Sequence, residues 1–324
     1  MNVLSVENYY RAVAFIHTHA RKLEQQLYYY HFQPIASSQQ DVISELAKFL
    51  NQDGGFGHAL EPDVRMNHSS VVATKCALQI LIDISASSSE PLVRDGISYL
   101  LDRFDEQNKI WSLVDEEIQN APHAPWWATD NLLTEFNQYL VNPRAGILKI
   151  LLHYNDLVPN NIITEVTDSL FSHLNQLPTD LAFFDTNAFL QLLQSEKLSK
   201  EHREILTQKL SETAVSIVSK NPDDWSKFSV KPLWLVPSPI APFYDVLKTS
   251  VTLNLHYEID NQQKDGSWAP TWDWGDTWKD VWSIVKKEWK GIITLATLRS
   301  LRDFNLIEGL SVPSPDKNFK YFMD

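Results

Sequence analysis

The chain has 324 residues, of which 44% are hydrophobic, and it carries a formal net charge of −13. This acidic balance disfavours nucleic acid and anionic membrane surfaces as partners, because both are bound by clustered Lys and Arg. The single cysteine, Cys76, excludes an internal disulfide and fits a reducing compartment.

The first predicted element is an N-terminal helical segment over residues 1–32. It lacks a basic region followed by an unbroken apolar run, which a signal peptide would have. No window of the chain approaches the ~18 apolar residues that a membrane span requires. We therefore expect a cytoplasmic protein without a transmembrane segment, and no required protein partner is evident.

Helical periodicity follows along most of the chain, with apolar residues three and four positions apart. The segments that show it are 42–50, 73–84, 93–104, 142–154, 204–219 and 289–304. Strand-like alternation is almost absent, and proline gathers in connecting stretches such as 231–243. The sequence therefore predicts an all-α fold of many short helices, with a C-terminal tail over residues 305–324.

A short motif recurs three times between the predicted helices, and each copy carries an aromatic residue followed five positions later by an acid. The copies are NQDGGFGHALEPD (51–63), DEQNKIWSLVDEE (105–117) and QQKDGSWAPTWDW (262–274). The aligned aromatic residues are Phe56, Trp111 and Trp268, and the aligned acids are Glu61, Glu116 and Asp273. We interpret each copy as a turn between helices, in which glycine supplies a positive φ and the aromatic packs back onto the helix pair. A phosphate-binding loop is disfavoured, because no Gly-Lys-Ser/Thr follows the glycines.

The stretch QQKDGSW (262–268) resembles the glutamine–tryptophan repeat of squalene–hopene cyclase and other terpenoid cyclases. The stretch NQDGGFG (51–57) resembles the variant found in protein prenyltransferase β subunits. The resemblance implies one α/α-toroid domain over residues 1–324, with roughly six helical hairpins arranged as inner and outer rings around a central cavity. It further implies an isoprenoid-processing enzyme or a prenyl-compound-binding protein, whose cavity is both aromatic and acidic.

The catalytic signatures of these families are not preserved. The stretch nearest to the Asp-x-Asp-Asp of class II cyclases, 182–194, keeps only Asp185, and Phe184 stands at the proton-donating position. The Asp-Asp-x-x-Asp of class I synthases is absent, as is the Asp-x-Cys of protein prenyltransferases. A lone cysteine on an apolar helix face, as Cys76 is, is typical of a core residue. No cofactor or metal site is evident, and Mg²⁺ is expected only if the substrate is a diphosphate.

Polar and aromatic residues gather in and after the three turns. Because equivalent loops of a toroid open on the same end, acids from separate repeats could meet at one cavity mouth. The candidate catalytic residues are Glu61, Asp63, Glu116, Asp185 and Asp273. The candidate substrate-binding residues are His58, Arg65, His123, Trp126, Trp127, Trp272 and Trp274. Acids ahead of a helix also cap it, so capping is the alternative role for each carboxylate.

Three functions follow from these residues. The first is the isoprenoid-directed function, in which aromatic faces stabilise carbocations. The second is a carbohydrate-active enzyme (a glycosidase, lyase or epimerase) that uses paired carboxylates beside tryptophan platforms. The third is a non-catalytic ligand-binding toroid, since a fold does not determine a function. In each case the expected partner is a small hydrophobic or sugar molecule.

Overall fold

The computed structural model describes residues 2–33, 38–128, 139–174, 176–178 and 180–310, and all structural statements below concern these residues. Their backbone is helical, with irregular connections and isolated β-bridges only, which confirms the predicted all-α class. None of the described helices combines the length and the apolar character needed to cross a bilayer. Most of the predicted C-terminal tail, residues 311–324, lies outside the described residues.

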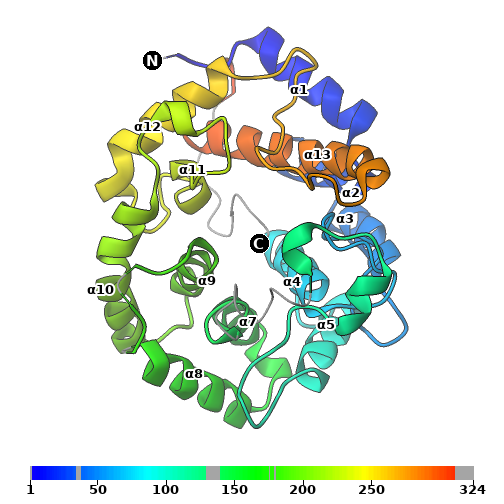
Figure 1. The fold of residues 1–324 in the computed structure, drawn as a ribbon, viewed down its shortest axis with the longest axis vertical. Helices are drawn as coiled ribbons and strands as arrows, with labels where there is room; N and C mark the ends of the chain where they lie inside the picture. The colour runs from blue at the N-terminus through cyan, green and yellow to red at the C-terminus, as the bar shows by residue number, and fades with distance from the viewer. Residues whose placement is uncertain (1, 34–37, 129–138, 175, 179, 311–324) are drawn as a thin grey trace. The chain divides into compact units, whose positions relative to one another are not determined.

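The chain divides into two compact units, which are described separately. Among the described residues, unit 1 combines those up to Glu45 with 214–310, and unit 2 runs from Leu46 to Thr213. The boundaries fall within helices α3 (Gln39–Leu46) and α10 (Lys200–Ile217). Figure 1 shows the course of the chain and labels its helices. Each of the six segments with helical periodicity overlaps a helix of the structure.

Unit 1 is built around its long last helix. That helix is α13 (Lys279–Asp303), and the unit also contains α1 (Val6–His19), α2 (Lys22–Phe32), α11 (Pro232–Leu235) and α12 (Tyr244–Asp260). Helix α13 packs against both α1 and α2, and at Gly291 a Cβ would lie only 2.8 Å from that of Ala20. In the segment that follows α13, Leu306 O accepts from the amide of Leu4 (2.8 Å), and the amide of Glu308 donates to Leu4 O (2.9 Å). The first and last described segments of the chain therefore meet within this unit.

Unit 2 has a buried layer of helices covered by more amphipathic ones. Its helices are α4 (Val71–Asp83), α5 (Pro91–Asp102), α7 (Arg144–His153), α8 (Asn160–Leu174) and α9 (Phe183–Leu193). Helices α4, α7 and α9 are buried over nearly their whole length, and α7 packs against both of the others. Helices α5 and α8 lie outside α4 and α7 (Figure 1), with their polar faces exposed. The more apolar helix after the first turn, α4, is thus a buried one.

The three motif copies form closely similar turns. In each, the residue two positions before the aromatic has a positive φ: +81° at Gly54, +59° at Lys109 and +88° at Gly266. Glycine suits this left-handed conformation at two copies, and a lysine adopts it at the third. The backbone amides of Gly54 and Gly266 donate to the carbonyls three residues earlier, at 3.2 and 2.8 Å. The recurring sequence pattern therefore corresponds to a recurring backbone geometry.

The aromatic residue of each turn is buried and anchored to neighbouring helices. The amides of Phe56 and Trp268 each donate, at 3.0 Å, to a threonine hydroxyl on the following helix, that of Thr74 and Thr294. The indole of Trp268 donates to Glu258 O (2.8 Å), and that of Trp111 donates to Leu100 O (2.6 Å), on the preceding helices. Trp268 is thus bonded to both flanking helices, Phe56 to the following helix and Trp111 to the preceding one.

Candidate functional site

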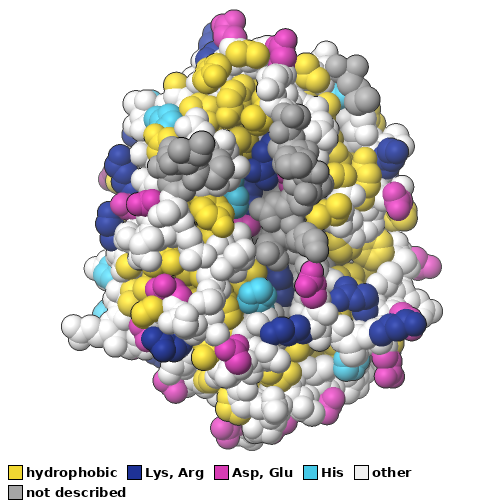
Figure 2. Space-filling view, turned by 180° about the vertical axis from the view of Figure 1, so that it is seen from behind, with side chains coloured by type: hydrophobic (Ala, Val, Ile, Leu, Met, Phe, Trp, Pro, Cys, Tyr) yellow, Lys and Arg dark blue, Asp and Glu magenta, His cyan; other side chains and the backbone are white. Residues whose placement is uncertain are grey.

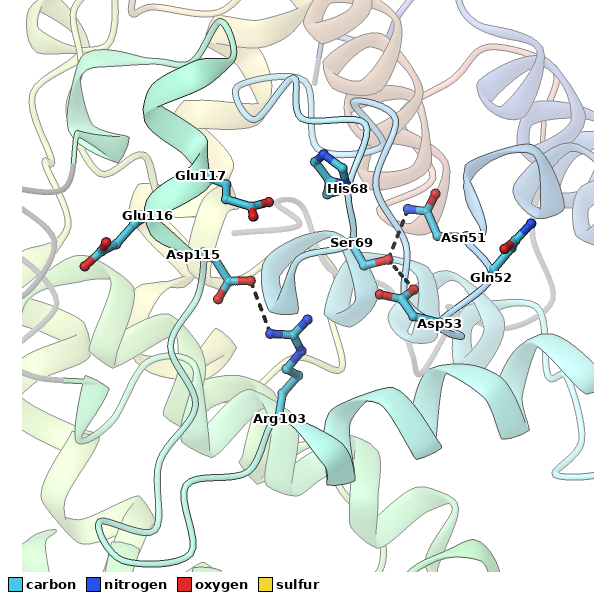
Figure 3. Close-up of a pocket in the computed structure, with 9 residues that line it drawn as sticks. All are labelled: Asn51, Gln52, Asp53, His68, Ser69, Arg103, Asp115, Glu116 and Glu117. Atoms are coloured by element: carbon cyan, nitrogen blue, oxygen red, sulfur yellow. Dashed lines mark hydrogen bonds and ion pairs between the residues drawn. The ribbon is translucent and has the colours of Figure 1, made fainter.

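Unit 2 contains an open groove of about 810 Å³ beside the first turn. Its lining residues are all polar or charged: Asn51, Gln52, Asp53, His68, Ser69, Arg103, Asp115, Glu116 and Glu117. They come from three segments, namely the first turn with the approach to α4, the end of α5, and the last residues of the second motif copy (Figure 3). Loops attached to two separate repeats therefore contribute to one groove.

The wall formed by the first turn is held by a short hydrogen-bond network. Asp53 Oδ1 accepts from the amide of Gly55 (3.1 Å) and from the hydroxyl of Ser69 (2.7 Å). Asn51 Nδ2 in turn donates to Ser69 Oγ at 3.0 Å (Figure 3). The predicted substrate-binding residue His58 has its Nε2 2.9 Å from Asn51 Oδ1, and so it buttresses this wall from outside the lining. One carboxylate oxygen of Asp53 is thus oriented by the turn itself.

The opposite wall depends on Arg103, at the C-terminal end of α5. Its Nη1 donates to Asp115 Oδ2 at 3.3 Å, and its guanidinium lies over the ring of Tyr99, 5.2 Å from the centroid. Both members of the ion pair are nearly half exposed, so the pair adds little stability, about 0–1 kcal/mol. Burial raises the pKa of Tyr99 to about 12; Arg103 lowers it, and the charges of Asp115 and Asp53 raise it. These two carboxylates therefore act on the same phenol beneath the groove.

The three successive acids of the second wall point in different directions. Asp115 is directed toward Arg103, and Glu117 points toward the side of the groove that carries His68 (Figure 3). Glu116, the predicted catalytic residue among the three, is exposed and points away from the other labelled side chains. The chemistry available within the groove therefore rests on its neighbours rather than on Glu116.

The other predicted acids of the first turn are buried. Glu61 and Asp63 are each 3% exposed, and they do not line the groove. Their loop pairs with the second predicted cluster, because Asp63 O accepts from the amide of Ala124 (3.0 Å) and Val64 forms a bridge with His123. The predicted residue Arg65 belongs to the same contact, its amide donating to a carbonyl of the paired segment at 3.1 Å.

The paired segment carries the predicted residues His123, Trp126 and Trp127. His123 is buried, with Nδ1 2.7 Å from Ala121 O, and Trp127 is buried while Trp126 is half-buried. The structure therefore brings together two clusters that lie about sixty positions apart in the sequence. It places them inside unit 2, beside the groove loops in the chain but outside the groove lining.

Asp185 occupies a different part of unit 2, in the first turn of α9. Its side chain is 6% exposed, and its Oδ1 accepts from the amide of Asn142 at 3.2 Å. Burial raises the pKa of this carboxyl to about 6, and the Asn142 hydrogen bond opposes that rise. Asp185 therefore titrates closer to neutrality than an ordinary aspartate.

Three predicted residues lie in unit 1. Asp273 is exposed and accepts from the amide of Gly275 at 2.8 Å, as a turn-stabilising residue does. Trp274 is fully buried. Trp272 lines a small cavity of about 20 Å³, together with the buried ion pair of Lys231 and Glu258 (2.9 Å). That volume is sufficient for about one water molecule.

Sequence reasoning missed several residues of the groove. Asp53 was visible as an aligned acid of the motif, and Asp115 and Glu117 flank the predicted Glu116. Arg103 and His68 carry no recurring spacing, and only the folded chain brings them to the groove. Within the described residues, no three side chains of His, Cys, Asp or Glu converge closely enough to hold a metal ion.

Comparison with known proteins finds no family model, no curated protein and no solved structure that matches this chain.

Proposed function

We propose that this chain binds a hydroxyl-rich small molecule of the carbohydrate class in the groove of unit 2 and acts on it with groove carboxylates. The observation that carries this proposal is the lining, which combines carboxylates, a guanidinium, an imidazole, amides and a hydroxyl and contains no apolar side chain. Sugar hydroxyls both donate and accept hydrogen bonds, so such a mixture of groups complements them. Paired carboxylates supply the acid and base that glycoside chemistry requires.

A comparison of two turns supports a binding role for Asp53 over simple capping. Asp265, its equivalent in unit 1, also accepts from the amide two positions later and from a serine hydroxyl, both of Ser267, but it is paired with Lys290 as well. Lys290 stands four residues before Thr294, and the position four residues before Thr74 is Ser70. The copy in unit 2 therefore lacks the lysine that engages the acid in unit 1, and its acid borders the groove instead.

The orientations suggest which carboxylates do the chemistry. Asp115 is engaged by Arg103, and Glu116 points away, whereas Glu117 is directed into the groove and Asp53 is fixed at its edge. We assign Asp53 and Glu117 as the acid–base pair. Asp115 and Arg103 then serve as hydrogen-bonding residues for the ligand.

Single substitutions of Asp53 and Glu117 provide the test, with the adjacent Glu116 as the control. The substitutions D53N and E117Q should each lower turnover of a responsive sugar by about 10²–10⁴-fold, the usual contribution of an acid or base. E116Q changes the same chemical group one residue away, and it should retain turnover within about twofold because Glu116 points away from the other labelled side chains of the groove. Loss of activity in E116Q with full activity in E117Q would contradict the assignment.

The ligand class is tested first by thermal unfolding with a panel of mono- and oligosaccharides, farnesyl and geranylgeranyl diphosphates, and squalene. A ligand at 100 times its dissociation constant adds about 2.7 kcal/mol of stability. Stabilisation by sugars that is lost in D53N supports the proposal. Binding without turnover would favour the non-catalytic ligand-binding alternative.

An isoprenoid-directed function is the second candidate, favoured by the aromatic cluster of unit 1. Trp272 packs edge-on against Trp289 (5.2 Å between centroids) and Trp234 (6.4 Å), and Phe228 caps them with an exposed ring. Aromatic faces of this kind can stabilise cationic intermediates. Stabilisation by prenyl compounds and not by sugars would favour this candidate, and Mg²⁺ dependence is then expected if the ligand is a diphosphate.

We also propose that the helices close into a single α/α toroid of roughly six hairpins and that the protein is cytoplasmic. The recurrence of one turn geometry in both units supports the first proposal, and an experimental structure with a linear superhelix would contradict it. The single, buried Cys76 supports the second, which cell fractionation tests.

A further inference from the structure

Arg144, the first residue of helix α7, is a buried arginine with only part of its guanidinium satisfied. The side chain is 1% exposed. Its Nη1 donates to Ser169 Oγ on α8 (2.9 Å) and to Lys109 O in the second turn copy (3.4 Å). Its Nε and Nη2 are also buried, and among the described residues no acceptor bonds to either of them.

The same edge of the guanidinium binds a carboxylate in two other arginines of this chain. Arg21 donates from Nε and Nη2 to the two oxygens of Glu24, at 2.9 and 2.7 Å. Arg302 donates from Nε and Nη2 to Asp303 Oδ1, at 2.9 and 2.8 Å, while its Nη1 donates to the carbonyl of His31. Arg144 repeats the arrangement of Arg302, with Nη1 on neutral oxygens, but in the described part of the chain no carboxylate bonds to its Nε/Nη2 edge.

Burial lowers the pKa of Arg144, and no carboxylate of the described residues opposes that effect. The nearby Lys109 and Glu165 form an ion pair with each other, so neither charge compensates the guanidinium. Burial lowers the pKa of His173, one turn after Ser169 on α8, and the charge of Arg144 adds to that effect. The N-terminus of α7 adds the positive end of a ten-residue helix. A buried guanidinium without a counter-charge destabilises the folded state, and a bound anion would remove that penalty.

We propose that Arg144 is the centre of a small-anion site at the contact of α7 and α8, and that its ligand is an oxyanion. Two parallel donors on one edge match two oxygens of a phosphate or carboxylate group, which is the geometry of the strongest arginine contacts. Ser169 holds the guanidinium in place through Nη1. None of these residues lines the groove, so the site is independent of the function proposed above.

The test measures binding of two probes, inorganic phosphate and acetate, to the full chain by calorimetry and thermal unfolding, with ionic strength held constant by sodium chloride. At least one probe should raise the unfolding temperature of the wild type. R144Q should weaken binding by about tenfold or more, because two charge-assisted hydrogen bonds are lost. R144K keeps the charge but not the two-donor edge, and it should also bind more weakly than the wild type.

R94Q is the matched control, since it makes the same change at an exposed arginine on α5, and it should bind as the wild type does. Equal stabilisation of the wild type and R144Q, or no stabilisation of the wild type by either probe, would overturn the proposal. If R144Q fails to fold, crystals of the wild type soaked in bromide decide the matter. An anomalous peak beside Nε and Nη2 supports the site, and its absence there overturns it.

Discussion

Asp185 shows how one buried carboxyl makes the stability of this chain depend on pH. Because its folded pKa of about 6 lies above the unfolded value near 3.9, the folded state holds its proton more tightly. Its contribution to stability is therefore greatest below pH ~4 and declines as the pH rises to ~6, by about 3 kcal/mol in order of magnitude. The buried site of Asp185 therefore favours the protonated carboxyl over the charged carboxylate.

Replacing Asp185 by asparagine should remove this penalty. The amide keeps an oxygen for the Asn142 hydrogen bond and carries no charge at any pH. Urea unfolding at pH 7.5 should show D185N to be more stable than the wild type by up to about 3 kcal/mol, and at pH 4.5 the difference should be much smaller. D168N, at an exposed position on α8, is the control. A D185N variant less stable than the wild type at pH 7.5 would count against the argument.

At the level of residues, the sequence predicts only some of the acids that line the groove. The alignment places Asp53 and Asp265 at equivalent positions, and the structure gives them the same turn bonds. Their difference arises from Lys290 on α13, more than twenty residues away, which forms an ion pair with Asp265. Burial alone would raise the pKa of Asp265, but Lys290 and Ser267 lower it to about 2. A motif aligned within its own window carries no information about such a distant partner.

At the scale of elements, the six segments with apolar periodicity were predictable as helices, and α12 was not. Its buried face contains Asn254 and Glu258. These polar groups are satisfied inside unit 1, since Lys231 donates to Glu258 (2.9 Å) and Asn254 bonds both Glu258 and the amide of Leu233. Apolar periodicity is a poor signal where a buried face is polar and its partners come from another segment.

We expect the threonines that accept a hydrogen bond from the amides of Phe56 and Trp268 to contribute measurably to the free energy of unfolding. In T74V and T294V the side-chain volume is preserved, but the buried amide of Phe56 or Trp268 loses its acceptor. Leaving a buried donor unpaired costs about 1–3 kcal/mol. Chemical denaturation should reveal a loss of that size in each variant.

The control for both variants is T164V on α8, where the threonine is exposed, so that its stability should change by less than about 0.5 kcal/mol. If T74V and T294V were as stable as T164V, the shared threonine would be incidental to the turn.

At the scale of the whole molecule, the repeat was the most informative feature of the sequence. Copies of one turn occur in both units, with φ values within 30° of one another and equivalent hydrogen bonds. The closure of the hairpins into one ring is a longer-range property, because it depends on how successive helix pairs are rotated along the chain. No motif encodes that rotation, and ring closure stays a prediction.

Net charge is the remaining property of the whole molecule, and it leads to a prediction about salt. The chain carries 41 acidic and 28 Lys and Arg residues. On the face drawn in Figure 2, acidic and basic side chains are interspersed, with no single-sign patch. A net charge of −13 produces general self-repulsion in the folded state.

Salt shortens the range of that repulsion, to a Debye length of about 10 Å at 0.1 M. Raising sodium chloride from 20 to 300 mM should therefore raise the unfolding temperature. The charge-neutralising variants E116Q and D168N should respond less steeply than the wild type, because each removes one negative charge. The measurement is thermal unfolding over a salt series at pH 7.5. An unfolding temperature that falls with salt would contradict this prediction, because it would mean that specific ion pairs outweigh the general repulsion. The surface ion pairs would then contribute more stability than is usual for exposed pairs.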